Sequence, residues 1–71
     1  MKFIKPNGNL FAICDDGRNI VKITGDYYAM IDGKSVISEG GDYIGEIKRD
    51  NASGRLCVIS EYGNLLFIIQ K

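Results

Sequence analysis

The glycines of this chain alternate between two kinds of turn signal, and this alternation restricts the fold more than any other feature. One kind reads Gly, then Asn or Asp, then Leu or Tyr, and it occurs at residues 8–10, 25–27, 41–43 and 63–65. The other kind reads Gly and then Arg or Lys, and it occurs at residues 17–18, 33–34 and 54–55. Glycine supplies the positive φ that tight hairpin turns need. The alternation therefore predicts a chain that reverses direction at short, regular intervals.

Part of this pattern is an internal repeat. Residues 17–21 read Gly-Arg-Asn-Ile-Val, and residues 33–37 read Gly-Lys-Ser-Val-Ile. Gly-Asp-Tyr at residues 25–27 returns at the same offset at residues 41–43. Turn chemistry alone could produce some of this match, but the fixed offset favours a duplicated hairpin. We divide the single domain, residues 1–71, into units of about 9–24, 25–40, 41–62 and 63–71.

Short runs rich in β-branched and aromatic residues separate the turns, and such runs are typical of strands. We expect strands at about residues 2–5, 10–14, 19–24, 27–31, 35–38, 43–48, 56–60 and 65–70. No window carries an apolar period suited to a helix. The sequence therefore predicts an all-β domain, an antiparallel meander of about eight short strands, closed as a small barrel or folded as a sandwich.

Alternation within the strands predicts two faces. In each strand after a glycine of the first kind, every second residue is assigned to the core face, and this set includes Tyr27 and Tyr43. The middle residue of the set is small in most of these strands. The second face is also largely apolar, which a sheet with one wet face would not be. We predict that this face mediates self-association, although folding of the chain over itself would also cover it. Tyr28 is also assigned to this face. The predicted interface residues of the face are Phe11, Ile13, Met30, Leu66 and Ile68.

A chain of 71 residues buries a small core and usually needs further stabilisation. Two cysteines without a histidine do not suffice for a structural zinc site, and we expect no metal or cofactor. No signal peptide follows Met1, so we expect a cytoplasmic, reducing location with Cys14 and Cys57 buried as free thiols. A Cys14–Cys57 disulfide is the alternative. Association with a second copy is then the favoured source of extra stability.

Charge and catalytic residues exclude several functions. Nine basic and nine acidic residues cancel, so net charge offers no argument for nucleic acid or an anionic membrane as the main partner. The absence of histidine removes the commonest general base, and no serine has an evident activating partner. We therefore expect a protein that is not an enzyme.

Two binding hypotheses follow. The first is an interaction module that binds another protein and forms a homo-oligomer. The second is a small barrel that binds a small molecule, a sugar or a nucleic acid through tyrosines and the Lys48–Arg55 segment, where an insertion interrupts the repeat. A solvated loop that tolerates insertion is the alternative explanation for that segment. The candidate binding residues are Tyr28, Lys48, Arg49, Arg55 and Tyr62.

Overall fold

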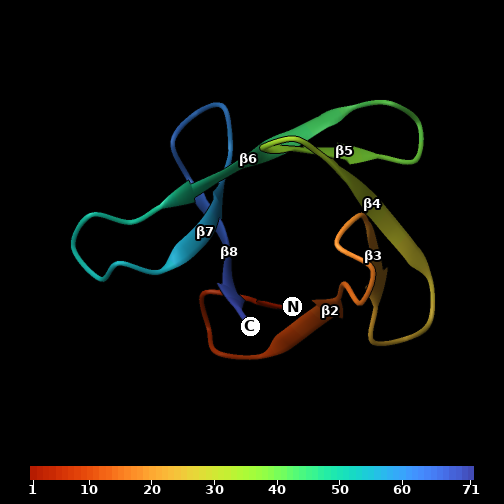
Figure 1. Cartoon of the computed structure of the whole chain (residues 1–71), viewed down its shortest axis with the longest axis horizontal. Helices are drawn as coiled ribbons and strands as arrows, with labels where there is room; N and C mark the ends of the chain where they lie inside the picture. Colours follow the sequence, from red (N-terminus) through yellow and green to blue (C-terminus); the bar gives the residue numbers. More distant parts are fainter.

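The computed structural model describes all 71 residues as a closed barrel of eight antiparallel strands (Figure 1). The strands are β1 (Lys2–Ile4), β2 (Leu10–Ile13), β3 (Asn19–Lys22), β4 (Tyr27–Asp32), β5 (Ser35–Ser38), β6 (Tyr43–Arg49), β7 (Leu56–Ile59) and β8 (Leu65–Gln70). Each strand pairs with the next, and β1 pairs with β8 to close the sheet. The predicted all-β meander is confirmed, and it closes as a barrel. No part of the chain forms a helix long and apolar enough to span a membrane.

Four turns of the same geometry form one end of the barrel, which we call the upper end. They begin at Lys5, Lys22, Ser38 and Ser60 and connect β1 to β2, β3 to β4, β5 to β6 and β7 to β8. In each turn the backbone N–H of the first residue donates to the carbonyl oxygen four residues later, and its carbonyl accepts from the glycine three residues later, at 2.8–2.9 Å. All four glycines have positive φ. The first-kind turn signal therefore specifies one structure four times.

The other connections and both chain ends lie at the opposite, lower end. Gly17 and Gly33 have φ of 77° and 64°, which confirms the positive φ expected there. Asp32 pairs with Ser35 across a two-residue turn. In the β2–β3 connection the carboxylate of Asp16 accepts from the backbone N–H of Asn19 at 2.7 Å and of Arg18 at 2.8 Å. These hydrogen bonds lower the pKa of Asp16 to about 2, because they favour the charged carboxylate.

A β-bulge occurs in each upper-end hairpin. Phe3 pairs with Ala12 but Ile4 pairs with Leu10, so Phe11 has no partner. The same register shift leaves one unpaired residue in each of the other three hairpins, and these residues are Tyr28, Ile44 and Leu66. All four bulge residues are half-buried and pack against the core. The prediction that Phe11, Tyr28 and Leu66 project away from the core is therefore wrong, because a bulge interrupts strict alternation.

The same bulges correct the predicted core face. Tyr27 and Tyr43 are 39% and 46% exposed, and neither packs against the core. Each tyrosine immediately precedes a bulge residue. The extra residue shifts the alternation by one position, so the tyrosine and the buried residue two positions later lie on opposite faces. The two tyrosines consequently lie on the outside of the barrel.

The middle of the barrel is a layer that takes one residue from each strand. The odd-numbered strands contribute Phe3, Ile20, Val36 and Val58, which are at most 1% exposed. Their cross-strand partners are Ala12, Ala29, Gly45 and Phe67. Three of the partners are small, as the sequence predicts for a crowded interior, and Phe67 fills the space that they leave. Its ring centroid lies 4.8 Å from that of Phe11 and 6.2 Å from that of Phe3.

Candidate functional site

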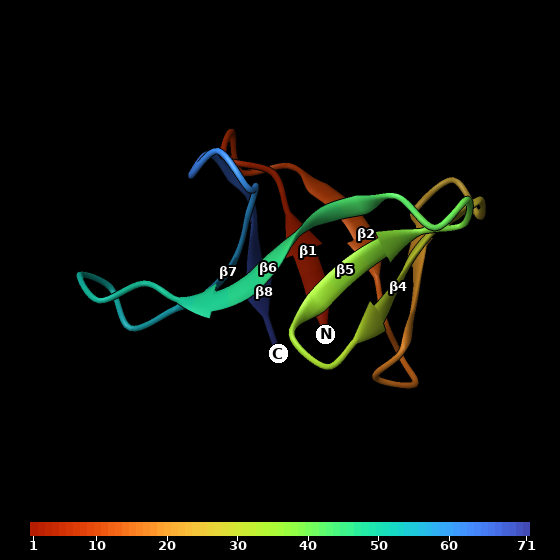
Figure 2. The ribbon, with the colours of Figure 1, turned by 90° about the horizontal axis from the view of Figure 1, so that it is seen from above.

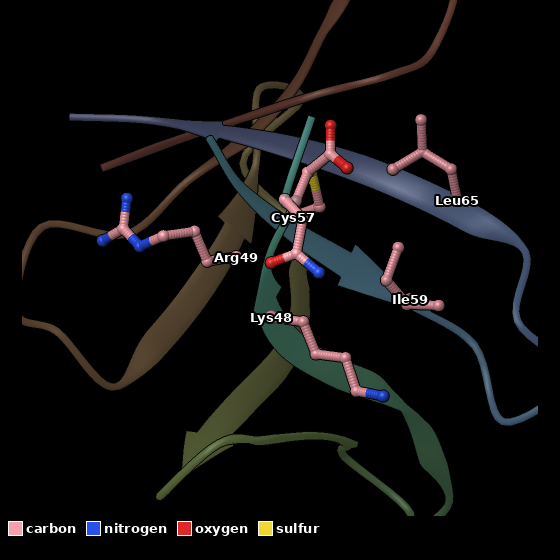
Figure 3. Close-up of a pocket in the computed structure, with 7 residues that line it drawn as sticks. Lys48, Arg49, Cys57, Ile59 and Leu65 are labelled. Atoms are coloured by element: carbon pink, nitrogen blue, oxygen red, sulfur yellow. The ribbon is translucent and has the colours of Figure 1, made fainter. Parts of the chain in front are cut away.

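A pocket of about 380 Å³ lies on the outer face of β6, β7 and β8 (Figure 3). Cross-strand pairing positions its walls: Lys48 pairs with Cys57, and Ile59 pairs with Leu65. Arg49, Asp50 and Asn51 complete the lining from the end of β6 and the connection that follows it. The pocket thus combines an apolar surface with two cations and one carboxylate. It contains two of the predicted binding residues, Lys48 and Arg49.

Cys57 belongs to this outer pocket and not to the barrel interior. Its side chain is only 6% exposed, but it is absent from the buried core cluster that includes Cys14. Both thiols are free, and the predicted burial is confirmed. Burial raises the pKa of the Cys57 thiol, the carboxylate of Asp50 raises it further, and Arg55 lowers it. A thiol with a raised pKa is a poor nucleophile at neutral pH, so the pocket offers no activated cysteine.

The two thiols should react at different rates with a thiol reagent. We expect native protein at neutral pH to label slowly at both sites, with Cys57 ahead of Cys14. Cys57 lines the outer pocket, which a reagent can enter, whereas Cys14 is enclosed among core residues. Labelling followed by mass spectrometry of Cys14→Ser and Cys57→Ser variants measures the two rates separately. Rapid modification of Cys14 in native protein would contradict its placement in the core.

The structure separates the predicted tyrosines from the predicted cations. Tyr62 is 83% exposed in the β7–β8 turn at the upper end. Tyr28 packs inside that end, with its ring 4.8 Å from that of Phe11, and burial raises its pKa. Lys48 and Arg49 lie in the lower half of β6, and Arg55 lies in the β6–β7 connection at the lower end. The fold therefore does not bring these tyrosines and cations together in one site.

The predicted interface residues divide between the inside and the outside. Phe11 and Leu66 are bulge residues that pack against the core. Ile13, Met30 and Ile68 are half-buried, and they do not belong to the core or to the residues packed on it. These three occupy equivalent positions on β2, β4 and β8, where each pairs across the strands with Val21, Ile37 and Ile4 respectively.

Pairing extends each of these three positions, and the equivalent Glu46 of β6, into a row of three residues on the outside of the barrel. Three rows are entirely apolar, and the fourth begins with a glutamate. The rows are Ile13–Val21–Tyr27, Met30–Ile37–Tyr43, Ile68–Ile4–Leu10 and Glu46–Ile59–Leu65. Of the predicted interface residues, only Ile13, Met30 and Ile68 belong to these rows, whereas Tyr27 and Tyr43 come from the predicted core face.

The first row is the most open. Val21 and Tyr27 are 36% and 39% exposed, and Ile23, in the turn that follows β3, is 59% exposed. Ile13, Val21 and Ile23 also line a groove of about 420 Å³, whose polar lining includes Asp15, Asp16 and Lys22. We call Ile13, Val21, Ile23 and Tyr27 the β2–β4 patch. Sequence analysis missed Val21, Ile23 and Tyr27, since only an allowance for the bulge places Tyr27 beside Val21.

Comparison with known proteins adds no assignment to these surfaces. No family model, no curated protein and no solved structure matches the chain. The functional argument therefore depends on the geometry of the barrel alone.

Proposed function

We propose that this protein is a non-enzymatic interaction module that self-associates and binds a partner protein through the β2–β4 patch. The observation that supports this proposal is the exposure of Val21, Ile23 and Tyr27 beside the half-buried Ile13, on three adjacent strands and a turn. Monomeric proteins expose few contiguous apolar patches, and larger ones commonly mark interaction sites.

The patch contributes nothing to the interior of the barrel. None of its four residues belongs to the core cluster or to the residues packed against it. Burial of apolar surface is favourable by about 25 cal/mol per Å², so Ile23 and Tyr27 lose stabilisation for as long as they face water. Contact with another protein would recover that stabilisation without any change in the fold.

The composition of the patch resembles that of a protein interface. Tyr27 presents an aromatic ring whose hydroxyl donates to Asn19 Oδ1 at 3.2 Å, so the ring has a fixed orientation. Asp15, Asp16 and Lys22 place charged groups along the adjoining groove. An apolar centre with a polar rim is the usual arrangement of protein interfaces. The groove is open to solvent and is lined by residues of strands and turns, which suits a protein surface better than a small enclosed ligand.

Sedimentation equilibrium from micromolar to near-millimolar concentration tests the proposal. We expect the wild type to form a reversible multimer of the 7.9 kDa chain. Ile23→Glu should give a folded monomer, because it places a charge in the patch at a side chain outside the core. Tyr62→Glu is the matched control, since it adds the same charge at an exposed residue outside the patch, and it should leave the mass distribution unchanged.

Three results would contradict the proposal. A wild type that stays monomeric throughout would refute self-association. A multimer that persists unchanged in Ile23→Glu would show that another surface forms the contact. Equal dissociation of Ile23→Glu and Tyr62→Glu would show a general effect of charge and not a specific interface.

A further inference from the structure

The β6–β7 hairpin differs from the rest of the barrel because it projects outward. Figures 1 and 2 show it extending from the barrel as a two-stranded arm, on the opposite side from the β3–β4 and β5–β6 turns. Four consecutive residue pairs join β6 to β7 without a bulge. Beyond them the N–H of Asp50 donates to the carbonyl of Arg55 at 2.7 Å, and the N–H of Gly54 donates to the carbonyl of Asp50 at 2.7 Å. The arm is therefore a regular β-ribbon with an ordered tip.

The arm also departs from the internal repeat in its charge. Ile31 and Ile47 are equivalent, because their N–H groups donate to the carbonyls of Arg18 and Lys34, both at 2.7 Å. Asp32-Gly33 follows Ile31 and forms a tight turn, whereas Lys48-Arg49 follows Ile47. An acidic turn is thus replaced by two cations, and the chain continues through the longer connection to Arg55.

The zero net charge conceals an asymmetry between the two ends of the barrel. Every lysine and arginine except Lys5 and Lys22 lies on the lower end or in the strand segments next to it. Five acidic residues lie there with these seven basic residues, Glu46 among them, which leaves an excess of two positive charges. The upper-end turns carry the opposite excess, and their acidic residues are Asp26, Glu39, Asp42 and Glu61. The net charge of the whole chain therefore does not describe the local charge of the surface that a ligand contacts.

The cations of the arm are largely unopposed. The one ion pair in the chain joins Lys48 Nζ to Glu46 Oε1 at 3.5 Å, and both side chains are exposed. Such a pair is weak in water. The carboxylate of Asp50 forms no ion pair and accepts a hydrogen bond from the hydroxyl of Ser53 at 2.7 Å within the tip. This hydrogen bond lowers the pKa of Asp50. Arg49 Nη1 donates to the carbonyl of Gly54, which steadies its guanidinium group against the arm.

We propose that the β6–β7 arm binds double-stranded DNA, with Lys48, Arg49 and Arg55 in contact with backbone phosphates. A two-stranded β-ribbon fits the major groove of a duplex. Lys48 and Arg49 extend in different directions from β6 (Figure 3), an arrangement suited to separate phosphates and not to one small anion. The arm contains no aromatic residue, so it lacks the stacking surfaces that single-stranded nucleic acid requires. The acidic β3–β4 and β5–β6 turns lie on the side of the barrel opposite the arm (Figures 1 and 2) and would face away from the duplex.

Fluorescence anisotropy of a fluorescein-labelled DNA duplex, titrated with the full chain at several salt concentrations, tests the proposal. Three phosphate contacts predict a slope of log K against log salt of about −3, and a dissociation constant of about 10–100 µM at low salt. Lys48→Gln/Arg55→Gln should raise the dissociation constant about tenfold or more and reduce the slope by about two. Lys5→Gln/Lys22→Gln is the matched control, because it removes the same charge from the upper end and should leave binding unchanged.

Two checks make the outcome decisive. Thermal unfolding of each variant shows whether it is folded, and Arg49→Lys keeps the charge of the arm but removes the guanidinium fork. No binding by the wild type at low salt would overturn the proposal. Equal loss of affinity in the two double variants would overturn it as well. Equal binding to a polyglutamate of matched charge would identify an acidic protein as the class of partner, and would refute nucleic acid.

Discussion

Gly45→Ala is expected to lower the free energy of unfolding by about 3 kcal/mol, because it overfills a crowded point of the barrel wall. A Cβ atom on Gly45 would lie 2.7 Å from the carbonyl oxygen of Ile59 and 3.0 Å from Val58 Cγ1. The first neighbour is backbone of an adjacent strand, so it cannot move aside without straining the β6–β7 ladder. A domain of this size has about 4–10 kcal/mol of stability in total, so the loss is a large fraction of it.

Urea denaturation followed by circular dichroism measures the change, with Gly40→Ala as the matched control. Gly40 has φ outside the positive range, and an added Cβ would meet only Asp42 Oδ2 at 3.9 Å. Its replacement should change stability by less than about 0.5 kcal/mol. Equal midpoints for Gly45→Ala and wild type would show that β6 and β7 do not approach each other as closely as described.

Phe67→Ala should be at least as damaging, with an expected loss of about 4 kcal/mol. Phe67 is 8% exposed, and its ring contacts those of Phe3, Phe11 and Tyr28. The facing residues Ala12, Ala29 and Gly45 are too small to close the resulting cavity, so little relaxation is available. Phe67→Leu should lose roughly half as much, since it keeps most of the buried volume.

The comparison for Phe67 is Tyr62→Ala, which removes a ring of similar size from the surface. Tyr62 is 83% exposed, and its replacement should cost less than about 0.5 kcal/mol. If Phe67→Ala were as mild as Tyr62→Ala, the aromatic cluster would not be the upper part of the core.

The turn residues were sufficient to predict the strands and the meander. Gly17 and Gly33 have the positive φ that their turn signals require, and Ser35–Ser38 is a strand with the expected bounds. The small middle residues Ala12 and Ala29 also lie in the crowded interior, as predicted. These features are local, because each depends on backbone conformation or side-chain size at one position.

The assignment of faces failed where a bulge adds a residue. Strict alternation places Phe11 and Ala12 on opposite faces, but the register shift between Phe3 and Ile4 turns both toward the interior. No single hairpin sequence reveals such a shift. The available signal was the recurrence of a large apolar residue at the same place in all four hairpins, at Phe11, Tyr28, Ile44 and Leu66.

The surface sites were only partly predictable for the same reason. Lys48, Arg49 and Arg55 come together because they are near in sequence on one hairpin. Val21 and Tyr27 meet through a cross-strand pair that depends on the bulge at Tyr28. Separation of the charges between the two ends appears only once the strands are ordered around the barrel, because composition carries no information on position.

The central claim is a closed barrel in which the bulge residues lie inside and the β2–β4 patch lies outside. Nuclear Overhauser spectra of isotope-labelled monomeric Ile23→Glu protein test this claim directly. We predict backbone contacts between Phe3 and Ile69, which close the barrel, together with ring contacts between Phe11 and Phe67. The side chain of Val21 should contact that of Tyr27 but not the ring of Phe67. Absence of the β1–β8 contacts, or a Phe11 ring without contact to Phe67, would contradict the account.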